Sequence, residues 1–178
     1  RRAPEQPRLL RFSIPPPEKS TFTGASPPAV SPDGHRVAFV ADTNSQSSLW
    51  IRDLDAFTAR LMPGTEGASF PFWSPDSRFV AFFAGGKLKK LDVAGAAVSS
   101  LADASNGIGG SWGKNDVILF TPDQMSVGGL FQVPSTGGNA SPATRPDPSL
   151  LEAAHVHPWF LPDGRHFLFI ATTAIPYR

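Results

Sequence analysis

Short apolar runs of strand length alternate with turns rich in proline and glycine along most of the chain. The run at 79–84, Phe-Val-Ala-Phe-Phe-Ala, is continuously apolar, as expected for a strand that is buried on both faces. An apolar segment at 71–73 and a Ser-Pro-Asp-Ser turn at 74–77 precede this run, and a Gly-Gly turn at 85–86 leads into a third segment at 88–93. The pattern predicts three antiparallel strands joined by tight turns.

This unit is repeated. Residues 28–41 and 158–171 align with residues 71–84 without a gap, and residues 110–120 form a degenerate copy that is one residue shorter in its turn. One column of the alignment is aromatic in every copy: Phe39, Phe82, Phe120 and Phe169. The copies begin at residues 28, 71, 110 and 158, a spacing close to the ~40–45-residue period of a four-stranded propeller blade.

We therefore predict an all-β fold, a β-propeller of about four blades. The expected division is a linker at residues 1–7 and a partial propeller at 8–178, with blades at approximately 27–63, 70–101, 110–145 and 157–178. The last blade lacks its third and fourth strands, and the chain begins with Arg1 rather than Met. We accordingly expect part of a larger propeller of roughly six blades, in which 167–172 presents an open strand edge and an uncovered apolar face.

The remaining segments of each blade follow the same plan. A strand is expected at 9–14, either closing a ring or forming a simple edge, and a polar loop at 42–48. Further strands are expected at 49–54, 60–62, 98–101, 117–120, 130–133 and 167–172, and 139–150 reads as a long loop with a weak outer strand. The four tryptophans fall inside or beside the repeats, which predicts that they pack between blades.

Turn chemistry explains why the motif recurs. Proline presets the bend, aspartate accepts hydrogen bonds from the turn backbone, and glycine takes the position with positive φ. Ser77 replaces this glycine in the second copy, at a cost of about 1 kcal/mol, so we expect that hairpin to be the weaker one. The residues assigned this structural role are Pro32, Asp33, Gly34, Trp73, Pro75, Asp76, Trp112, Pro162, Asp163 and Gly164.

Bulk composition excludes several functions. With 16 Lys and Arg against 15 Asp and Glu, the formal net charge is +1, so no global field attracts nucleic acid. Cysteine is absent, which excludes disulfides and thiol catalysis. No apolar run reaches the ~18–20 residues of a membrane span, and no signal peptide is visible.

The repeat of the Trp-Ser-Pro-Asp-Gly-Arg type resembles the TolB-like β-propeller, whose blades are WD40-like PD40 repeats. The segments at 11–14, 65–76, 85–90, 110–112 and 160–167 are most similar to the propeller that follows the membrane span in a family of bacterial serine/threonine protein kinases. This resemblance implies a propeller outside the cytoplasm, tethered through an upstream transmembrane helix. The chain itself carries no kinase motif.

Three motifs suggest chemistry, and each has a simpler explanation. The Gly-Gly-Ser-Trp-Gly segment at 109–113 matches a nucleophile elbow, but a β-run follows it where the elbow requires a helix. Glu152, His155 and His157 suggest a metal site, with both histidines on one strand face, but no third ligand lies at a defined spacing. Lys87, Lys89 and Lys90 read as protection of a strand edge.

The expected function is noncatalytic binding or sensing, without cofactor or metal. A protein or small-molecule ligand would bind the loops that enter the inner strands, at 64–69, 102–109 and 152–157, together with 42–48 and 121–128. The candidate binding residues are Asn44, Glu66, Asn106, His155 and His157. The alternatives are the gating propeller of a prolyl-oligopeptidase-like hydrolase and a Tol-type cell-envelope scaffold, because one fold hosts many functions.

Overall fold

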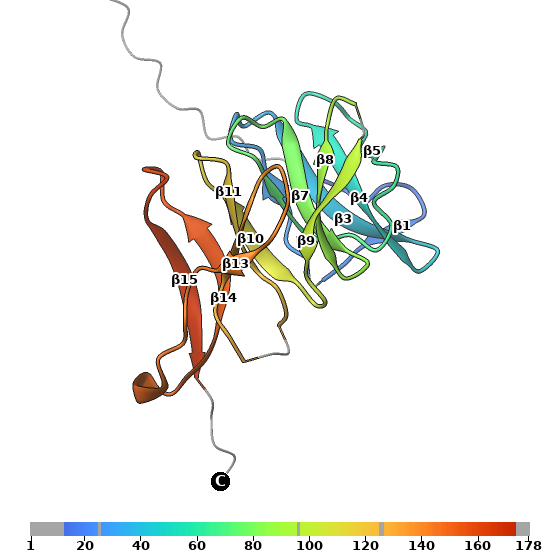
Figure 1. The fold of residues 1–178 in the computed structure, drawn as a ribbon. Helices are drawn as coiled ribbons and strands as arrows, with labels where there is room; N and C mark the ends of the chain where they lie inside the picture. The colour runs from blue at the N-terminus through green and yellow to red at the C-terminus, as the bar shows by residue number, and fades with distance from the viewer. Residues whose placement is uncertain (1–12, 25, 96, 125–126, 174–178) are drawn as a thin grey trace, which may run out of the picture.

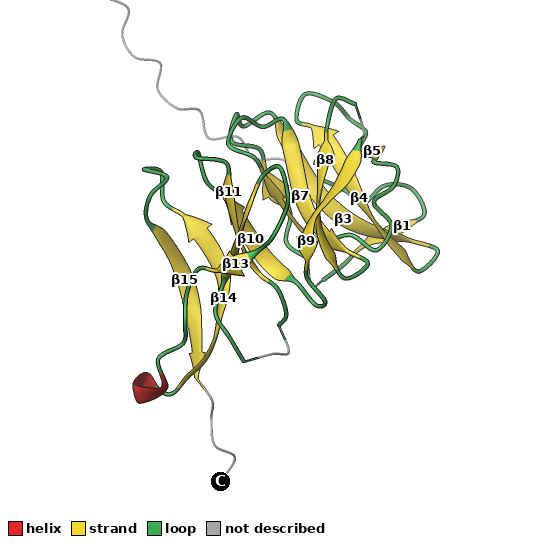
Figure 2. Ribbon diagram, in the orientation of Figure 1, coloured by secondary structure: helices red, strands yellow, loops and turns green. Residues whose placement is uncertain are grey.

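The structure is a computed structural model that describes residues 13–24, 26–95, 97–124 and 127–173. Four antiparallel sheets lie side by side in chain order (Figure 1), and the described residues contain one short 3-10 helix beside these strands (Figure 2). The predicted all-β propeller of about four blades is therefore confirmed. The strand expected at 9–14 falls largely outside the described residues, and Ser13 and Ile14 are not in a strand.

Each sheet is one blade. Blade one contains β1 (Ser20–Phe22), β2 (Ala29–Val30), β3 (Arg36–Thr43), β4 (Gln46–Asp53) and β5 (Arg60–Leu61). Blade two contains β6 (Ser69–Trp73), β7 (Phe79–Ala84), β8 (Lys87–Asp92) and β9 (Val98–Asp103). Blade three contains β10 (Ile108–Trp112), β11 (Val117–Thr121), β12 (Phe131–Pro134) and β13 (Ser141–Pro142). Blade four contains β14 (Glu152–Phe160) and β15 (Phe167–Thr173), after the 3-10 helix η1 (Pro148–Leu150).

Two predicted loops are in fact strands. The polar segment at 42–48 is a tight hairpin in which only Asn44 and Ser45 lie outside β3 and β4; both have positive φ, 52° and 63°, as in a type I′ turn. The segment at 152–157 is the first part of β14, so blade four begins before His157. The first error arises because polar side chains in a strand read as loop when their pairing partner is unknown. The second arises because residues 152–157 precede the repeat, which begins at Pro158, so the alignment gives no strand there.

The innermost strands share a bulge. Phe70, Gly109 and His157 have φ values of 47°, 62° and 53°, and the pairing register shifts around each of them in β6, β10 and β14. The corresponding residue of blade one is Pro27, whose ring forbids positive φ. Instead, the innermost strand of blade one is split into β1 and β2, which pair with different parts of β3.

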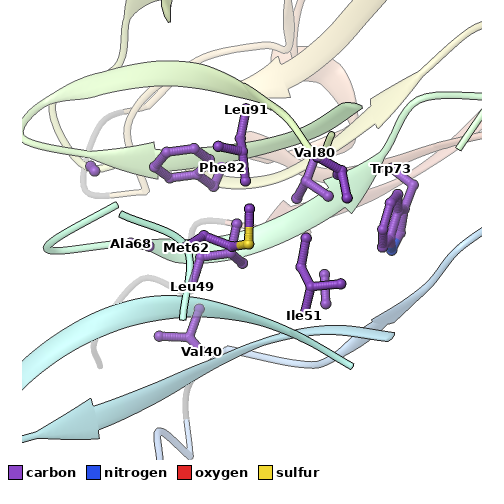
Figure 3. Packing of buried hydrophobic residues seen from close by; sticks show 12 residues of the cluster. Val40, Leu49, Ile51, Met62, Ala68, Trp73, Val80, Phe82 and Leu91 are labelled. Carbon is purple, nitrogen blue, oxygen red and sulfur yellow. The ribbon is translucent and has the colours of Figure 1, made fainter. Parts of the chain in front are cut away.

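Apolar side chains between successive blades form the core. Val40, Leu49 and Ile51 of blade one pack against Val80 and Phe82 of blade two (Figure 3). A second cluster joins blades two and three through Phe83, Leu88, Trp112 and Phe120. Trp73 and Trp112 are only 6% and 7% exposed, which confirms that these tryptophans pack between blades.

The far side of blade four is exposed. Within the described residues β15 pairs with β14 alone, and Leu168 and Ile170 are 60% and 55% exposed, which agrees with the expected open edge and apolar face. Trp159 is 68% exposed on β14. The prediction that all four tryptophans pack between blades is therefore wrong for Trp159, because no described blade covers that side. It is also wrong for Trp50, which packs with Val37 and Phe39 of its own blade.

Candidate functional site

The loops that enter the innermost strands meet at one end of the blades, which we call the loop face. It contains the segments at 62–68 and 104–107 and the hairpin turns at 44–45 and 85–86, since antiparallel strands bring these turns to the same end. A depression of about 220 Å³ lies there between blades two and three. It is lined by both entry loops, by the 85–86 turn and by Gln124.

The depression has polar side chains without charge. Asn106 is exposed, and its backbone carbonyl oxygen accepts a hydrogen bond from the backbone N–H of Gln124 at 3.0 Å. Ser105 Oγ donates to a carboxylate oxygen of Asp123 at 3.1 Å, which ties the entry loop of blade three to the segment after β11. These contacts hold two amide side chains at the rim, and amides both donate and accept hydrogen bonds.

A buried threonine holds the other wall in place. Thr65 is fully buried, and its hydroxyl donates to the Met62 carbonyl at 2.6 Å and accepts the Leu49 N–H at 3.0 Å. The Gly67 N–H donates to the Ser47 carbonyl at 2.8 Å. Glu66 is exposed on this loop beside Gly67, so its carboxylate lies next to the depression rather than in its lining.

Two of the bulge residues approach each other. The rings of Phe70 and His157 have centroids 6.2 Å apart, although they come from blades two and four. Gly109 belongs to blade three, the blade between them, and a Cβ atom at this position would lie 2.6 Å from His157 Nδ1. Glycine is therefore needed at 109 both for its positive φ and for this close approach. Phe70 also lines the depression, so His157 lies at its margin.

His155 belongs to a different environment. It is 3% exposed, its Nδ1 lies 2.7 Å from Thr144 Oγ1 and its Nε2 lies 3.0 Å from Glu152 Oε2. The Asp147 N–H, followed by the His155 ring, lowers the pKa of the Glu152 carboxyl. His155 thus fastens the 144–152 segment onto blade four and does not reach the depression.

The prediction that His155 and His157 share a strand face is therefore wrong, because the bulge at His157 reverses the alternation of β14. Among the described residues, no group of three or more His, Asp and Glu side chains is arranged to hold a metal ion. Asn44 is exposed in the 44–45 turn and is not part of the depression lining.

The opposite end of the blades carries the Pro-Asp-Gly turns. The Ser31 hydroxyl, the His35 N–H and the Arg36 guanidinium lower the pKa of Asp33 to about 2. The Ser74 hydroxyl, together with the Arg78 N–H, lowers the pKa of Asp76, and the His166 ring has the same effect on the pKa of Asp163. As predicted, the third turn residue has positive φ: 73° in Gly34, 60° in Ser77 and 70° in Gly164.

The serine of the elbow-like motif is a structural residue. Ser111 lies inside β10, and its Oγ accepts the Phe160 N–H at 2.9 Å, which joins blades three and four. In the lysine cluster, Lys87 pairs with Asp103, and Lys90 Nζ donates to the Ser135 carbonyl at 2.7 Å. Lys90 therefore bonds to the next blade rather than only protecting an edge.

Phe70 and Gln124 line the depression, but neither is among the candidate binding residues that the sequence indicates. Phe70 stands just before the predicted apolar segment at 71–73, and the alignment alone does not reveal that its column bulges. Gln124 lies in the expected loop at 121–128, but only the folded chain brings it beside Asn106.

No helix in the described part of the chain is long and apolar enough to cross a membrane. No family model matches the sequence, and no curated protein matches it.

Solved structures do match. The TolB structure from Acinetobacter baumannii is similar with a TM-score of 0.68 at 16% identity, over 83% of this chain and 37% of that one. A putative TolB from Agrobacterium tumefaciens has a TM-score of 0.63 at 18% identity, over 85% of this chain and 61% of that one. An acylaminoacyl peptidase complex with a chloromethyl ketone has a TM-score of 0.51 at 17% identity, over 72% of this chain and 25% of that one.

The chain therefore spans between about a third and three fifths of the two TolB structures. At these identities the likeness concerns the arrangement of blades. The chain has the fold of the TolB-like β-propellers.

Proposed function

We propose that this chain is a noncatalytic binding and sensing module that takes its ligand on the loop face. The observation that carries the proposal is the depression between blades two and three, where Asn106 and Gln124 stand at the rim of glycine-rich loops. Loops on a rigid stack of blades are the usual place for recognition in such folds. Uncharged amides, together with the rings of Phe70 and Phe83 in the lining, suit a ligand held mainly by hydrogen bonds, such as a loop of another protein or a small polar molecule.

We further propose that the module is the extracytoplasmic region of a membrane-bound bacterial serine/threonine kinase. The support is the resemblance of the repeat residues to that family's propeller. The alternatives are a gating propeller of a serine hydrolase and a Tol-type scaffold, because similar blades occur in an acylaminoacyl peptidase and in TolB.

The coding sequence on both sides of this chain tests the kinase assignment. A kinase domain followed by an apolar span upstream is the expected result. An α/β-hydrolase domain downstream would refute it in favour of the gating role, and a chain that continues only into further blades would refute it in favour of a scaffold.

A photo-crosslinking experiment tests the binding site itself. Benzoylphenylalanine is placed at Asn106, with a matched protein carrying it at Phe57, which is 96% exposed between β4 and β5 at the opposite end. Both proteins are irradiated in envelope extracts of the source cells. We expect a discrete adduct from Asn106 that Gln124→Lys abolishes. Equal labelling from both positions, or an adduct insensitive to Gln124→Lys, would contradict a site in the depression.

A further inference from the structure

A cleft lies between blades three and four, near the end of the blades that carries the Pro-Asp-Gly turns. Arg36 is the first residue of β3 and Phe79 is the first residue of β7. Each packs on a tryptophan of the next blade. The Arg36 guanidinium lies 5.2 Å from the Trp73 ring, and Phe79 stacks on Trp112 at 6.0 Å and 19°. These contacts fill the space near the Pro-Asp-Gly turns.

Blade three has a shorter residue at this position. Strand pairing of Trp73 with Val80 and of Trp112 with Ile118 makes Val117 the counterpart of Phe79. Phe160 pairs with Phe167 in the same way as Trp73 pairs with Val80. Phe160 therefore occupies in blade four the position that Trp73 and Trp112 have in blades two and three. Valine is too short to cover Phe160 as Phe79 covers Trp112. A cleft of about 370 Å³ remains, with Val117, Leu119, Phe160 and Phe167 in its lining.

A second position in the same cleft is polar. Ala38 pairs with Ile51 in blade one, Ala81 with Lys90 in blade two, and Leu119 with Gln132 in blade three. Ile51 is fully buried in the core, and Lys90 lies over the Phe79 ring and bonds to the next blade. Gln132 is exposed, lines the cleft, and its amide has no hydrogen-bond partner among the described residues.

An unpaired cation stands at the rim. Arg165 corresponds to Arg78, whose guanidinium pairs with Asp92 at 2.9 Å. The Arg165 guanidinium makes neither an ion pair nor a hydrogen bond within the described part of the chain. The nearby Asp163 carboxylate is bonded to His166 at 2.6 Å, and Lys114 Nζ donates to the Pro162 carbonyl at 2.9 Å. The rim therefore has a guanidinium available for an anion.

We propose that this cleft is a binding site for a small aromatic carboxylate. Phe160 and Phe167 meet edge to face at 5.9 Å and 73°, which presents a ring surface for a planar apolar group. The Arg165 fork and the Gln132 amide complement a carboxylate, since guanidinium binds carboxylate in a bidentate manner. A volume of about 370 Å³ lies in the range of ~300–1,000 Å³ typical of small-molecule pockets. The site is separate from the loop face and does not depend on the function proposed for it.

Titration calorimetry with 3-phenylpropionate tests the site. We expect saturable binding to the parent chain, and at least tenfold weaker binding of the uncharged 3-phenylpropionamide. Arg165→Gln should weaken the carboxylate to the level of the amide. Arg60→Gln is the matched control and should leave affinity unchanged, because Arg60 is exposed in β5 of blade one, whereas the cleft lies between blades three and four.

Filling the cleft provides the second arm. Val117→Phe introduces the residue that blade two has at this place, so it should abolish binding while the thermal midpoint is held or raised. Circular dichroism reports whether Val117→Phe folds. If it does not, Gln132→Ile, which introduces the blade-one residue, is used to fill the cleft instead. Absence of saturable binding to the parent, equal affinity for acid and amide, or binding that survives both a filled cleft and Arg165→Gln would overturn the proposal.

Discussion

Replacing Trp73 with alanine tests the packing between blades one and two. The indole is 6% exposed within the cluster that joins the two blades (Figure 3). Its Nε1 donates to the Ala29 carbonyl at 2.9 Å, and Arg36 stacks over the ring. Trp73→Ala removes all three interactions and opens a cavity between the blades.

The expected loss follows from these contacts. Truncation of a buried aromatic residue costs about 3–5 kcal/mol. The hydrogen bond accounts for about 0.5–1.5 kcal/mol and the cation over the ring for about 0.5–1 kcal/mol, so we expect the upper half of that range. A domain is stable by only ~5–15 kcal/mol. The change should therefore remove a large share of the free energy of unfolding.

Urea unfolding followed by far-ultraviolet circular dichroism is the appropriate assay, because tryptophan fluorescence changes with the substitution itself. Trp159→Ala is the matched control. That side chain is 68% exposed, and its removal should change stability by no more than about 0.5 kcal/mol.

Two phenylalanine variants separate the hydrogen bond from the packing. Trp73→Phe loses the bond to Ala29, whereas Trp112 Nε1 has no partner among the described residues. Trp73→Phe should therefore cost about 1 kcal/mol more than Trp112→Phe. If Trp73→Ala unfolded at the same urea concentration as Trp159→Ala, the alignment of blades would be wrong.

Three further predictions concern the turns and the inner strands. Ser77→Ala should lower the urea midpoint more than Ser77→Gly. Both variants lose the hydrogen bond from the Asp33 N–H at 3.0 Å, but only glycine relieves the strain of the positive φ of 60°. Equal midpoints would argue against strain at this turn. Gly110→Ala should cost about 1–3 kcal/mol, because its Cβ would lie 2.4 Å from the Phe72 ring, and Phe72→Ala in the same chain should restore part of the loss in the same assay; an unchanged Gly110→Ala protein would refute this contact. Ser31 and its neighbours lower the pKa of Asp33 from 3.8 to about 2 in the folded chain, so the stabilising effect of the Asp33 carboxylate is present above about pH 4 and is lost as the pH falls towards 2. Asp33→Asn should therefore flatten the dependence of the free energy of unfolding on pH across that window. An identical pH dependence would contradict the assignment.

The local sequence determined the blades. The apolar run at 79–84 is a strand at the predicted bounds, and the Pro-Asp-Gly turns have the positive φ that glycine permits. These features depend on neighbours within a few residues, where steric restrictions and turn hydrogen bonds act. The spacing of the repeats then indicated a propeller, because each blade needs another to cover its apolar face.

Contacts between blades decided the rest. The bulges at Phe70 and His157 move side chains that strict alternation would place elsewhere, which separates His155 from His157 and brings His157 beside a ring from blade two. Val117 creates a cleft only because Phe160 of the following blade faces it. These arrangements join residues about one blade length or more apart along the chain. Their outcome depends on the volumes of side chains that meet in space, so the tertiary structure, and not the local pattern, determined where ligands have room to bind.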